Sequence, residues 1–281
     1  MQSRGDGVLA GKTVLAVFAH PDDESIACGG TLARLSDAGA RIVLFCASRG
    51  ERGALTGPAR DDRLAESRTF ELEQAARTLG IRDLLVFNHP DGDLRWAEVT
   101  DLLAEIAMTI ARFRPAAVIT FGEDGLYWHL DHIGVHERTT AALGLLRASA
   151  PPLYYVTMPR GMMISVVEHA ISGGWTPPPK GFWSLPPKAF GLHANDPTII
   201  VDVGDWTERK LAAIKCHRSQ TSPDDPFGRL SAAQAREWLG LEHFHRASTI
   251  GAGEPVLELI ARPAVGSDGR HRATTESVSN S

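Results

Sequence analysis

The sequence lacks the features that mark several common protein classes. Its 281 residues include only three cysteines, far apart and without a CxxC pair, namely Cys28, Cys46 and Cys216. Reduced thiols are therefore expected rather than a disulfide framework. No run of eighteen apolar residues occurs, and the first residues contain no apolar signal-peptide segment. The net charge of −5 gives no indication of binding to nucleic acid or to an anionic membrane. A cytoplasmic protein without either partner is expected, and homo-oligomerisation stays open.

Two enzyme motifs are also missing. The segment "CGGTL" at 28–32 suggests a phosphate loop, but it matches neither G-x-G-x-x-G nor G-x-x-x-x-G-K-[ST]. Its glycines fall inside an expected helix rather than at its start. No G-x-S-x-G elbow is present either. Nucleotide binding at this segment and serine hydrolysis are therefore not supported.

What is present is a regular alternation of strand-like and helical patterns in a chain that is 43% hydrophobic. Gly80 follows the second helical pattern, where a glycine stop is typical. The alternation predicts an α/β fold with a single-domain, Rossmann-like, doubly wound and mostly parallel sheet and helices on both faces. The expected strands cover 13–19, 41–47, 84–87, 116–121, 153–157 and 198–203, and the expected helices cover 24–39, 62–79, 96–113, 132–147 and 206–217.

The pattern indicates one domain over residues 11–263. Residues 1–10 are expected to be a flexible N-terminus, and residues 264–281, which lack apolar periodicity, a disordered tail. The segment 159–197 is rich in Pro, Gly and Trp and is expected to be irregular, covering the site and setting substrate choice. Its aromatic residues, Trp175, Phe182 and Trp183, would either contact substrate or only anchor the loop.

Two polar motifs follow apolar strands, "AHPDDE" at 19–24 and "WHLDHIGVH" at 128–136. In a parallel sheet both strands end at the same edge, where open α/β sheets bind ligands. Imidazole and carboxylate groups without a thiol suit Zn²⁺. His20, Asp23 and one histidine of the second motif would supply three ligands and leave a position open for water. Asp22 is then free to take a proton from that water.

The pair of motifs resembles the LmbE/PIG-L-type zinc-dependent N-deacetylases, which remove acetyl groups from N-acetylated amino sugars. The signature A-H-[PA]-D-D-E is met in full at 19–24. The second signature, H-P-D-H, is present at 129–132 with Leu130 in place of proline. The resemblance implies one zinc ion per chain. The roles that it implies are zinc ligands at His20, Asp23 and His132, a general base at Asp22, an oxyanion-stabilising or proton-donating His129, and an Asp131 that holds His129 in its reactive tautomer.

Weaker matches extend the resemblance over most of residues 13–220. They are "SRGERG" at 48–53, "RTFELEQAARTLG" at 68–80, "PDGDL" at 90–94 and "KCHRSQ" at 215–220. The resemblance implies substrate contacts at Arg68 and Asp91 and an additional acid near the leaving amine at His217. The structural alternatives are a solvated Arg68 paired with Glu71, and a Glu24 that is only a first-turn acid favoured by the helix dipole.

The function that these features favour is zinc-dependent removal of an acetyl group from an N-acetylglucosamine-type amino sugar or small glycoconjugate. An amidase acting on a larger mycothiol-type S-conjugate is an alternative within the same chemistry. A zinc-site protein that binds an acyl-sugar without turnover is a second alternative, which the presence of Asp22 disfavours. The partner in each case is a small molecule, whose identity the sequence leaves open.

Overall fold

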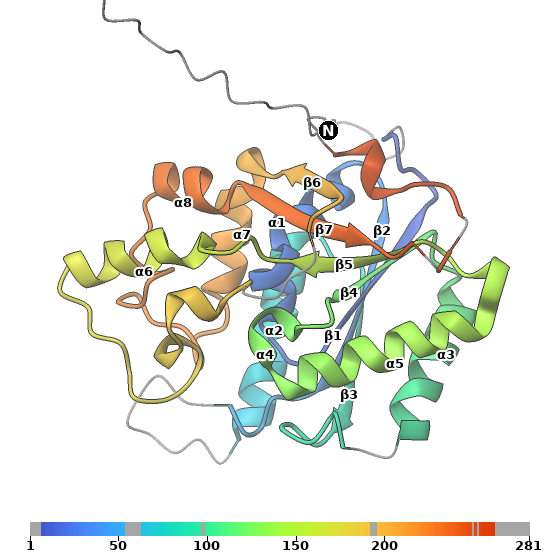
Figure 1. Ribbon diagram of the computed structural model, residues 1–281, viewed down its shortest axis with the longest axis horizontal. Coiled ribbons are helices and arrows are strands. Elements are labelled where there is room, and N and C mark those ends of the chain that lie inside the picture. The colour runs from blue at the N-terminus through green and yellow to red at the C-terminus, as the bar shows by residue number, and fades with distance from the viewer. Residues whose placement is uncertain are drawn as a thin grey trace, which may run out of the picture.

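The computed structural model describes residues 7–261, apart from 54–62, 97–98, 192–195, 249 and 252. The expected tail at 264–281 and residues 1–6 of the expected flexible N-terminus lie outside the described residues. A seven-stranded sheet with the order β3-β2-β1-β4-β5-β7-β6 forms the centre of the molecule (Figure 1). Its strands are β1 (Thr13–Phe18), β2 (Arg41–Ser48), β3 (Asp83–His89), β4 (Ala117–Phe121), β5 (Leu153–Thr157), β6 (Ile199–Asp202) and β7 (Leu241–Arg246).

The first five strands of the sheet are parallel, and β7 pairs antiparallel with both β5 and β6. Strands β4 and β5 are buried at every position, as is β1 after its first residue. Continuous burial explains why these strands are apolar runs rather than alternating patterns. The predicted α/β class with a mostly parallel sheet is confirmed. The strand order reverses at β1, which has β2 on one side and β4 on the other.

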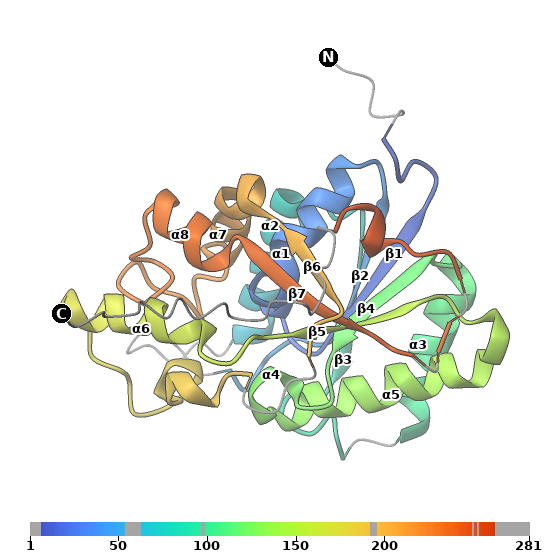
Figure 2. The same ribbon diagram turned by 45° about the horizontal axis from the view of Figure 1, so that its top comes forward.

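Helices cover both faces of the sheet (Figures 1 and 2). Helices α1, α2 and α7 pack against one another on one face, and α3 packs against α5 on the other. Helix α2 ends at Gly80, which has φ +79°, as the glycine stop predicts. The helices are α1 (Asp23–Asp37), α2 (Leu64–Leu79), α3 (Val99–Phe113), α4 (Gly125–Trp128), α5 (Leu130–Leu146), α6 (Met162–Ser172), α7 (Thr207–Ile214) and α8 (Ala232–Leu239). Short 3-10 turns occur at Arg147–Ser149, Phe182–Ser184, Pro187–Ala189, Gly204–Trp206 and Leu257–Leu259.

Helix α1 is not the uninterrupted helix that the sequence predicts. It is broken at Cys28, which has φ −152° and ψ 29°. The N–H groups of Gly30 and Thr31, exposed by this break, donate to the Glu242 carboxylate of β7 at 3.0 and 2.6 Å. A Cβ atom at Gly30 would lie only 2.7 Å from the Cβ of Val203. Gly30 of "CGGTL" therefore serves close packing, and Glu242 caps the second half of the helix.

Two further differences from the sequence prediction concern the C-terminal half. The segment 159–197 is not irregular throughout, because it begins with the 11-residue helix α6. The buried side chains of α6, such as Met163 and Val166, belong to a second apolar cluster beside the main core. Strand β7 and helix α8 are not predicted at all. The capping box of α8, formed by Ser231 and Gln234, is the signal that would have located it.

Candidate metal and catalytic site

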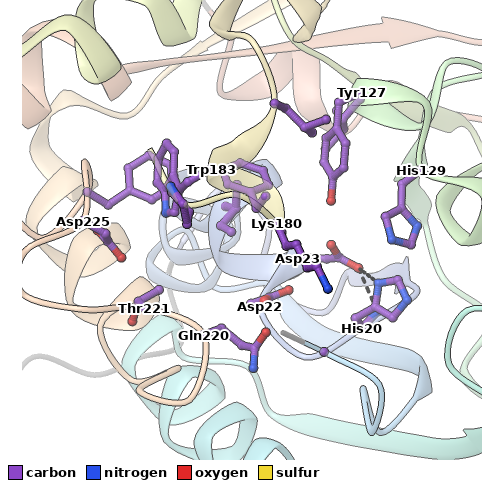
Figure 3. Close-up of a pocket in the computed structure, with 18 of the residues that line it drawn as sticks. His20, Asp22, Asp23, Tyr127, His129, Lys180, Trp183, Gln220, Thr221 and Asp225 are labelled. Atoms are coloured by element: carbon purple, nitrogen blue, oxygen red, sulfur yellow. Dashed lines mark hydrogen bonds and ion pairs between the residues drawn. The ribbon is translucent and has the colours of Figure 1, made fainter. Parts of the chain in front are cut away.

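The two signature motifs meet because β1 and β4 are neighbours in the sheet. The chain leaves β1 into α1 and leaves β4 into α4 and α5, so both motifs lie where the strand order reverses. This is the position at which open α/β sheets bind ligands. The ring centroids of His20, His129 and His132 lie 4.5–5.4 Å from one another. Figure 3 shows Asp22, Asp23, His20 and His129 around the same space.

Asp23 lies between the two imidazoles that the sequence predicts as its partners. Its Oδ2 is 3.5 Å from His20 Nδ1, and its Oδ1 is 3.1 Å from His132 Nε2. The Nδ1 of His132 is 3.1 Å from the Gly125 carbonyl oxygen and donates to it, so Nε2 keeps its lone pair. This Nε2 is buried and has no hydrogen-bond partner among the described residues. A buried lone pair that faces a carboxylate fits a bound cation, and the three side chains therefore fit a metal ion.

The Nε2 atom of His20 contacts two carboxylates, on the side of the ring opposite Asp23. It lies 3.0 Å from Asp131 Oδ2 and 3.1 Å from Asp91 Oδ1. Burial opposes a charged ring, but the hydrogen bonds to Asp131, Asp23 and Asp91 outweigh it and raise the pKa of His20 well above its usual value. With Nε2–H held by the two carboxylates, a metal ion would replace the second ring proton on Nδ1, the nitrogen that faces Asp23. A carboxylate behind a histidine is the usual support of a metal ligand.

The position of Asp131 corrects one prediction. The sequence resemblance places it against His129, whereas its carboxylate contacts His20 and accepts the N–H groups of Gly92 and Leu94 at 2.6 and 2.9 Å. These backbone donors fix the carboxylate on the His20 side. The Nδ1 of His129 is buried without a hydrogen-bond partner in the described part of the chain.

Two groups of three donor atoms lie within 4.8 Å of one another in this region, His20–His129–His132 and His20–Asp91–Asp131. The second group is occupied by hydrogen bonds through His20 Nε2. The first surrounds the space that Asp23 also faces. The metal therefore fits on the Nδ1 side of His20, and His129 lies close enough to act on a group bound there.

Asp22, the predicted general base, faces the cavity. It is partly exposed in the cavity, and its Oδ2 accepts from Arg68 Nη2 at 3.1 Å. Burial raises the pKa of Asp22 to about 6, although the positive charge of Arg68 opposes the shift. A carboxylate with this pKa is ionised at neutral pH and can accept a proton from water.

His129 is neutral at physiological pH. Burial, followed by the charges of His132 and His20, lowers its pKa to about 3. Figure 3 shows its ring beside the cavity and close to Tyr127, whose hydroxyl points into the same space. A neutral imidazole at this position can donate a hydrogen bond to an oxygen atom of a bound molecule.

Arg68 and Asp91 both line the cavity, but each is held by groups of the protein. Arg68 is buried and donates to the carbonyl oxygens of Gly50 and Pro21 at 2.8 and 2.6 Å, so it is not a solvated helix residue. A Cβ atom at Gly50 would lie 2.3 Å from Arg68 Nη1, which explains that glycine of "SRGERG". Burial opposes ionisation of Asp91, but the hydrogen bond and charge of His20, the Arg52 N–H and the charge of Arg68 together outweigh it and lower the pKa of Asp91 to about 2. Their contacts with substrate stay a prediction.

His217 lies behind the site and not in it. The side chain is fully buried, is absent from the cavity wall, and contacts Glu24 Oε1 through Nε2 at 2.9 Å. The predicted role as an acid at the leaving amine does not fit this placement, because His217 does not line the cavity and its Nε2 is held by Glu24. Glu24 has no site role in the sequence prediction, yet its Oε2 accepts the Asp22 N–H at 3.0 Å.

The site opens into a cavity of about 750 Å³. Residues 175–185 of the segment 159–197 line part of it, among them Trp175, Lys180, Phe182 and Trp183, and the predicted role of this segment in substrate choice stays a prediction. The Trp183 ring meets the Phe227 ring edge-on, with centroids 4.8 Å apart. Figure 3 shows Trp183 and Asp225 at the end away from His20 and His129. The cavity therefore extends well beyond the space of the predicted metal ligands.

An α/β sheet with a histidine and aspartate cluster at its switch point, open to a cavity, is typical of Rossmann-like enzymes, and the cluster is a candidate metal site. The chain belongs to the PIG-L family: the family model "PIG-L: GlcNAc-PI de-N-acetylase" matches residues 15–143. It is 31% identical to the 1D-myo-inositol 2-acetamido-2-deoxy-alpha-D-glucopyranoside deacetylase of Thermobispora bispora, over 91% of this chain and 93% of the relative. The protein of the same name in Nakamurella multipartita is 32% identical, over 86% of this chain and 90% of the relative. The resemblance predicted from the motifs is confirmed.

Solved structures share the fold at lower identity. The N,N'-diacetylchitobiose deacetylase of Pyrococcus horikoshii has a TM-score of 0.57 and 23% identity, over 84% of each chain. GalB, the 4-carboxy-2-hydroxymuconate hydratase of Pseudomonas putida, has a TM-score of 0.59 and 20% identity, over 87% of this chain and all of that one. Because a deacetylase and a hydratase share this fold, the fold alone does not decide the reaction. None of the described helices has the length and apolarity needed to cross a membrane.

Proposed function

We propose that this protein is a zinc-dependent hydrolase that removes the acetyl group from an N-acetylglucosamine-type amino sugar or a small glycoconjugate. The observation that carries the proposal is the cluster of His20, Asp23 and His132 beside the carboxylate of Asp22 at one end of the cavity. The relatives named as deacetylases of an acetamido sugar support the substrate class.

The donor set of two imidazole nitrogens and one carboxylate suits zinc, and one ion per chain is proposed. When bound, the ion would supply positive charge that acidifies a water molecule and polarises the acetyl carbonyl group. Asp131 and Asp91 would keep a proton on His20 Nε2, so that His20 Nδ1 stays available as a ligand of the metal.

The remaining chemistry belongs to two side chains. Asp22 takes a proton as the water oxygen bonds to the acetyl carbon. His129, which is neutral at physiological pH, donates a hydrogen bond to the acetyl carbonyl oxygen as this oxygen becomes negative. The carbon–nitrogen bond then breaks, and the amine receives its proton from Asp22 or His129, which gives acetate and the free amino sugar.

The two alternatives receive less support. The matching relatives are named as deacetylases, which favours an acetyl group over a larger acyl group of a mycothiol-type conjugate. Binding without turnover would require loss of the base, and Asp22 faces the cavity. A cytoplasmic location is part of the proposal and is supported by the three free cysteines.

The test measures free amine released from N-acetylglucosamine, N,N'-diacetylchitobiose, the N-acetylglucosaminyl-inositol and a mycothiol-type conjugate, with and without a chelator. We expect amine release from at least one acetylated sugar, loss on chelation, and recovery with zinc. His20→Ala and His132→Ala should lose the metal, whereas the control His245→Ala, on β7, should retain it. Full metal retention in both ligand variants would reject the ligand assignment. Failure of the zinc-loaded protein to release amine from any acetylated sugar would reject the function.

A further inference from the structure

The backbone of Asp22 has an unusual conformation. Its φ of 120° and ψ of −26° lie in the region that favours glycine and strains any residue with a side chain. Such a conformation persists only where neighbouring groups hold it. The same residue is the proposed general base, so whatever holds its backbone also places its carboxylate.

One holding group is Glu24. The Asp22 carbonyl oxygen accepts the N–H groups of Ser25 and Ile26 at 3.1 and 3.0 Å, which fixes its direction at the start of α1. The Asp22 N–H then donates to Glu24 Oε2 at 3.0 Å. The helix fixes the peptide group that follows Asp22. The Glu24 carboxylate, which accepts the Asp22 N–H, therefore determines how the peptide group between Pro21 and Asp22 is rotated.

Glu24 is itself fixed from behind. Its Oε1 accepts the Ser25 hydroxyl at 2.5 Å and His217 Nε2 at 2.9 Å, and both Glu24 and His217 are buried. The turn that carries His217 is tied to α2, because Ser219 donates its N–H and hydroxyl to the Glu71 carboxylate at 2.8 and 2.7 Å. A series of hydrogen bonds therefore connects α2 to the 217–220 turn, this turn to Glu24, and Glu24 to the Asp22 backbone.

A second holding group contacts the carboxylate of Asp22. Arg68 Nη2 donates both to Asp22 Oδ2 at 3.1 Å and to the Pro21 carbonyl oxygen at 2.6 Å. Arg68 lies on α2, the helix that also carries Glu71. The main chain and side chain of Asp22 are thus fixed from two directions by one scaffold.

We propose that the buried Glu24–His217 pair positions the base: it holds Asp22 in its strained conformation and thereby aims the Asp22 carboxylate into the cavity. Neither member touches substrate. The inference rests on the proposed role of Asp22 as the base, and it gives a single structural purpose to the "RTFE" and "KCHRSQ" segments.

The competing role for His217 is that of a proton donor to the leaving amine, and two substitutions separate the roles. In His217→Gln the amide nitrogen takes the place of Nε2 and still donates to Glu24, but it cannot transfer a proton. His217→Leu removes the donor. We expect kcat to fall about a hundredfold in His217→Leu and to stay within about threefold of wild type in His217→Gln, with KM and zinc content unchanged in both. Equal losses in the two variants would overturn the proposal.

Glu24→Gln provides a readout that needs no turnover. Its amide can accept from Asp22 N–H or from His217, but its NH₂ group faces the other donor. Crystal structures of the wild type and Glu24→Gln should show Asp22 at positive φ only in the wild type. The exposed Glu73→Gln on α2 is the matched control and should leave Asp22 unchanged. An unchanged Asp22 in Glu24→Gln would overturn the proposal even if His217→Leu failed to fold. Absence of any sugar deacetylation by the zinc-loaded wild type would instead reject the proposed function, and the crystal structures would still decide the positioning role.

Discussion

Asp131 should control metal affinity rather than the chemistry at His129. Its carboxylate accepts three donors, His20 Nε2 at 3.0 Å and the N–H groups of Gly92 and Leu94. Asp131→Asn turns one oxygen into an NH₂ group, which must face at least one of these donors. His20 then loses part of the support that keeps its Nδ1 lone pair directed at the metal.

The size of the effect follows from the partners of His20. Loss of a carboxylate behind a metal-binding histidine weakens metal affinity by about 10–100-fold. Asp91 Oδ1 remains 3.1 Å from the same Nε2 and compensates in part. We therefore expect zinc affinity to fall by about tenfold, the lower end of this range, which corresponds to about 1.4 kcal/mol of binding free energy. The double variant Asp91→Asn/Asp131→Asn should lose more than the sum of the two single variants, because each acid replaces the other.

The assay is competition for zinc between the protein and a chromophoric chelator at equilibrium. Asp93→Asn is the matched control, because Asp93 lies in the 90–94 turn with Asp91, and its half-exposed carboxylate accepts from Arg52 Nη1 at 2.7 Å. An unchanged zinc affinity in Asp131→Asn, together with a large fall in kcat, would show that Asp131 acts on His129 and refute the reasoning.

Three further predictions address the base, the core and the cavity. Asp22→Asn should retain zinc and lose about 10²–10⁴-fold in kcat, since asparagine cannot take a proton; near-normal turnover would exclude Asp22 as the base. Lys210→Met should reduce the free energy of unfolding in urea by about 3–5 kcal/mol, because it leaves the buried Glu242 carboxylate without its cation, while exposed Lys188→Met should change it little. Trp175→Ala and Trp183→Ala should change kcat/KM unequally across N-acetylated sugars at constant zinc content; a uniform loss that follows the melting temperature would mean that these rings only anchor the segment.

The sequence predicts where the site lies because the position depends on few rules. Apolar runs locate β1 and β4, and parallel strands that are neighbours place the residues after them together. Polar groups in "AHPDDE" and "WHLDHIGVH" then meet without any knowledge of side-chain conformation. The same rules give the α/β class and the end of α2 at Gly80.

The partners of individual side chains are not predictable in this way. His20 and His129 have ring centroids only 4.9 Å apart, so a carboxylate on the first turn of α5 can reach either ring. Which one it contacts depends on the N–H groups of the 90–94 turn. The burial of His217 likewise depends on Glu24, which a motif comparison treats as an ordinary helix acid. Strand β7 is missed because charged residues interrupt it and because it pairs with β6 across two helices, α7 and α8, and with β5, which precedes β6 in the chain.

The cap that Glu242 places on α1 has a consequence for the order in which the protein is completed during synthesis. The family match ends at residue 143, and both motifs have left the ribosome long before residues 241–246 are made. Until then the broken helix that begins with Asp23 lacks the carboxylate that satisfies Gly30 and Thr31, and β5 lacks its neighbour on one side. A fragment ending at residue 143 would hold every proposed metal ligand and the base. It would not hold the strand that fixes the helix carrying Asp23, and such a fragment is therefore not expected to fold into a working metal site.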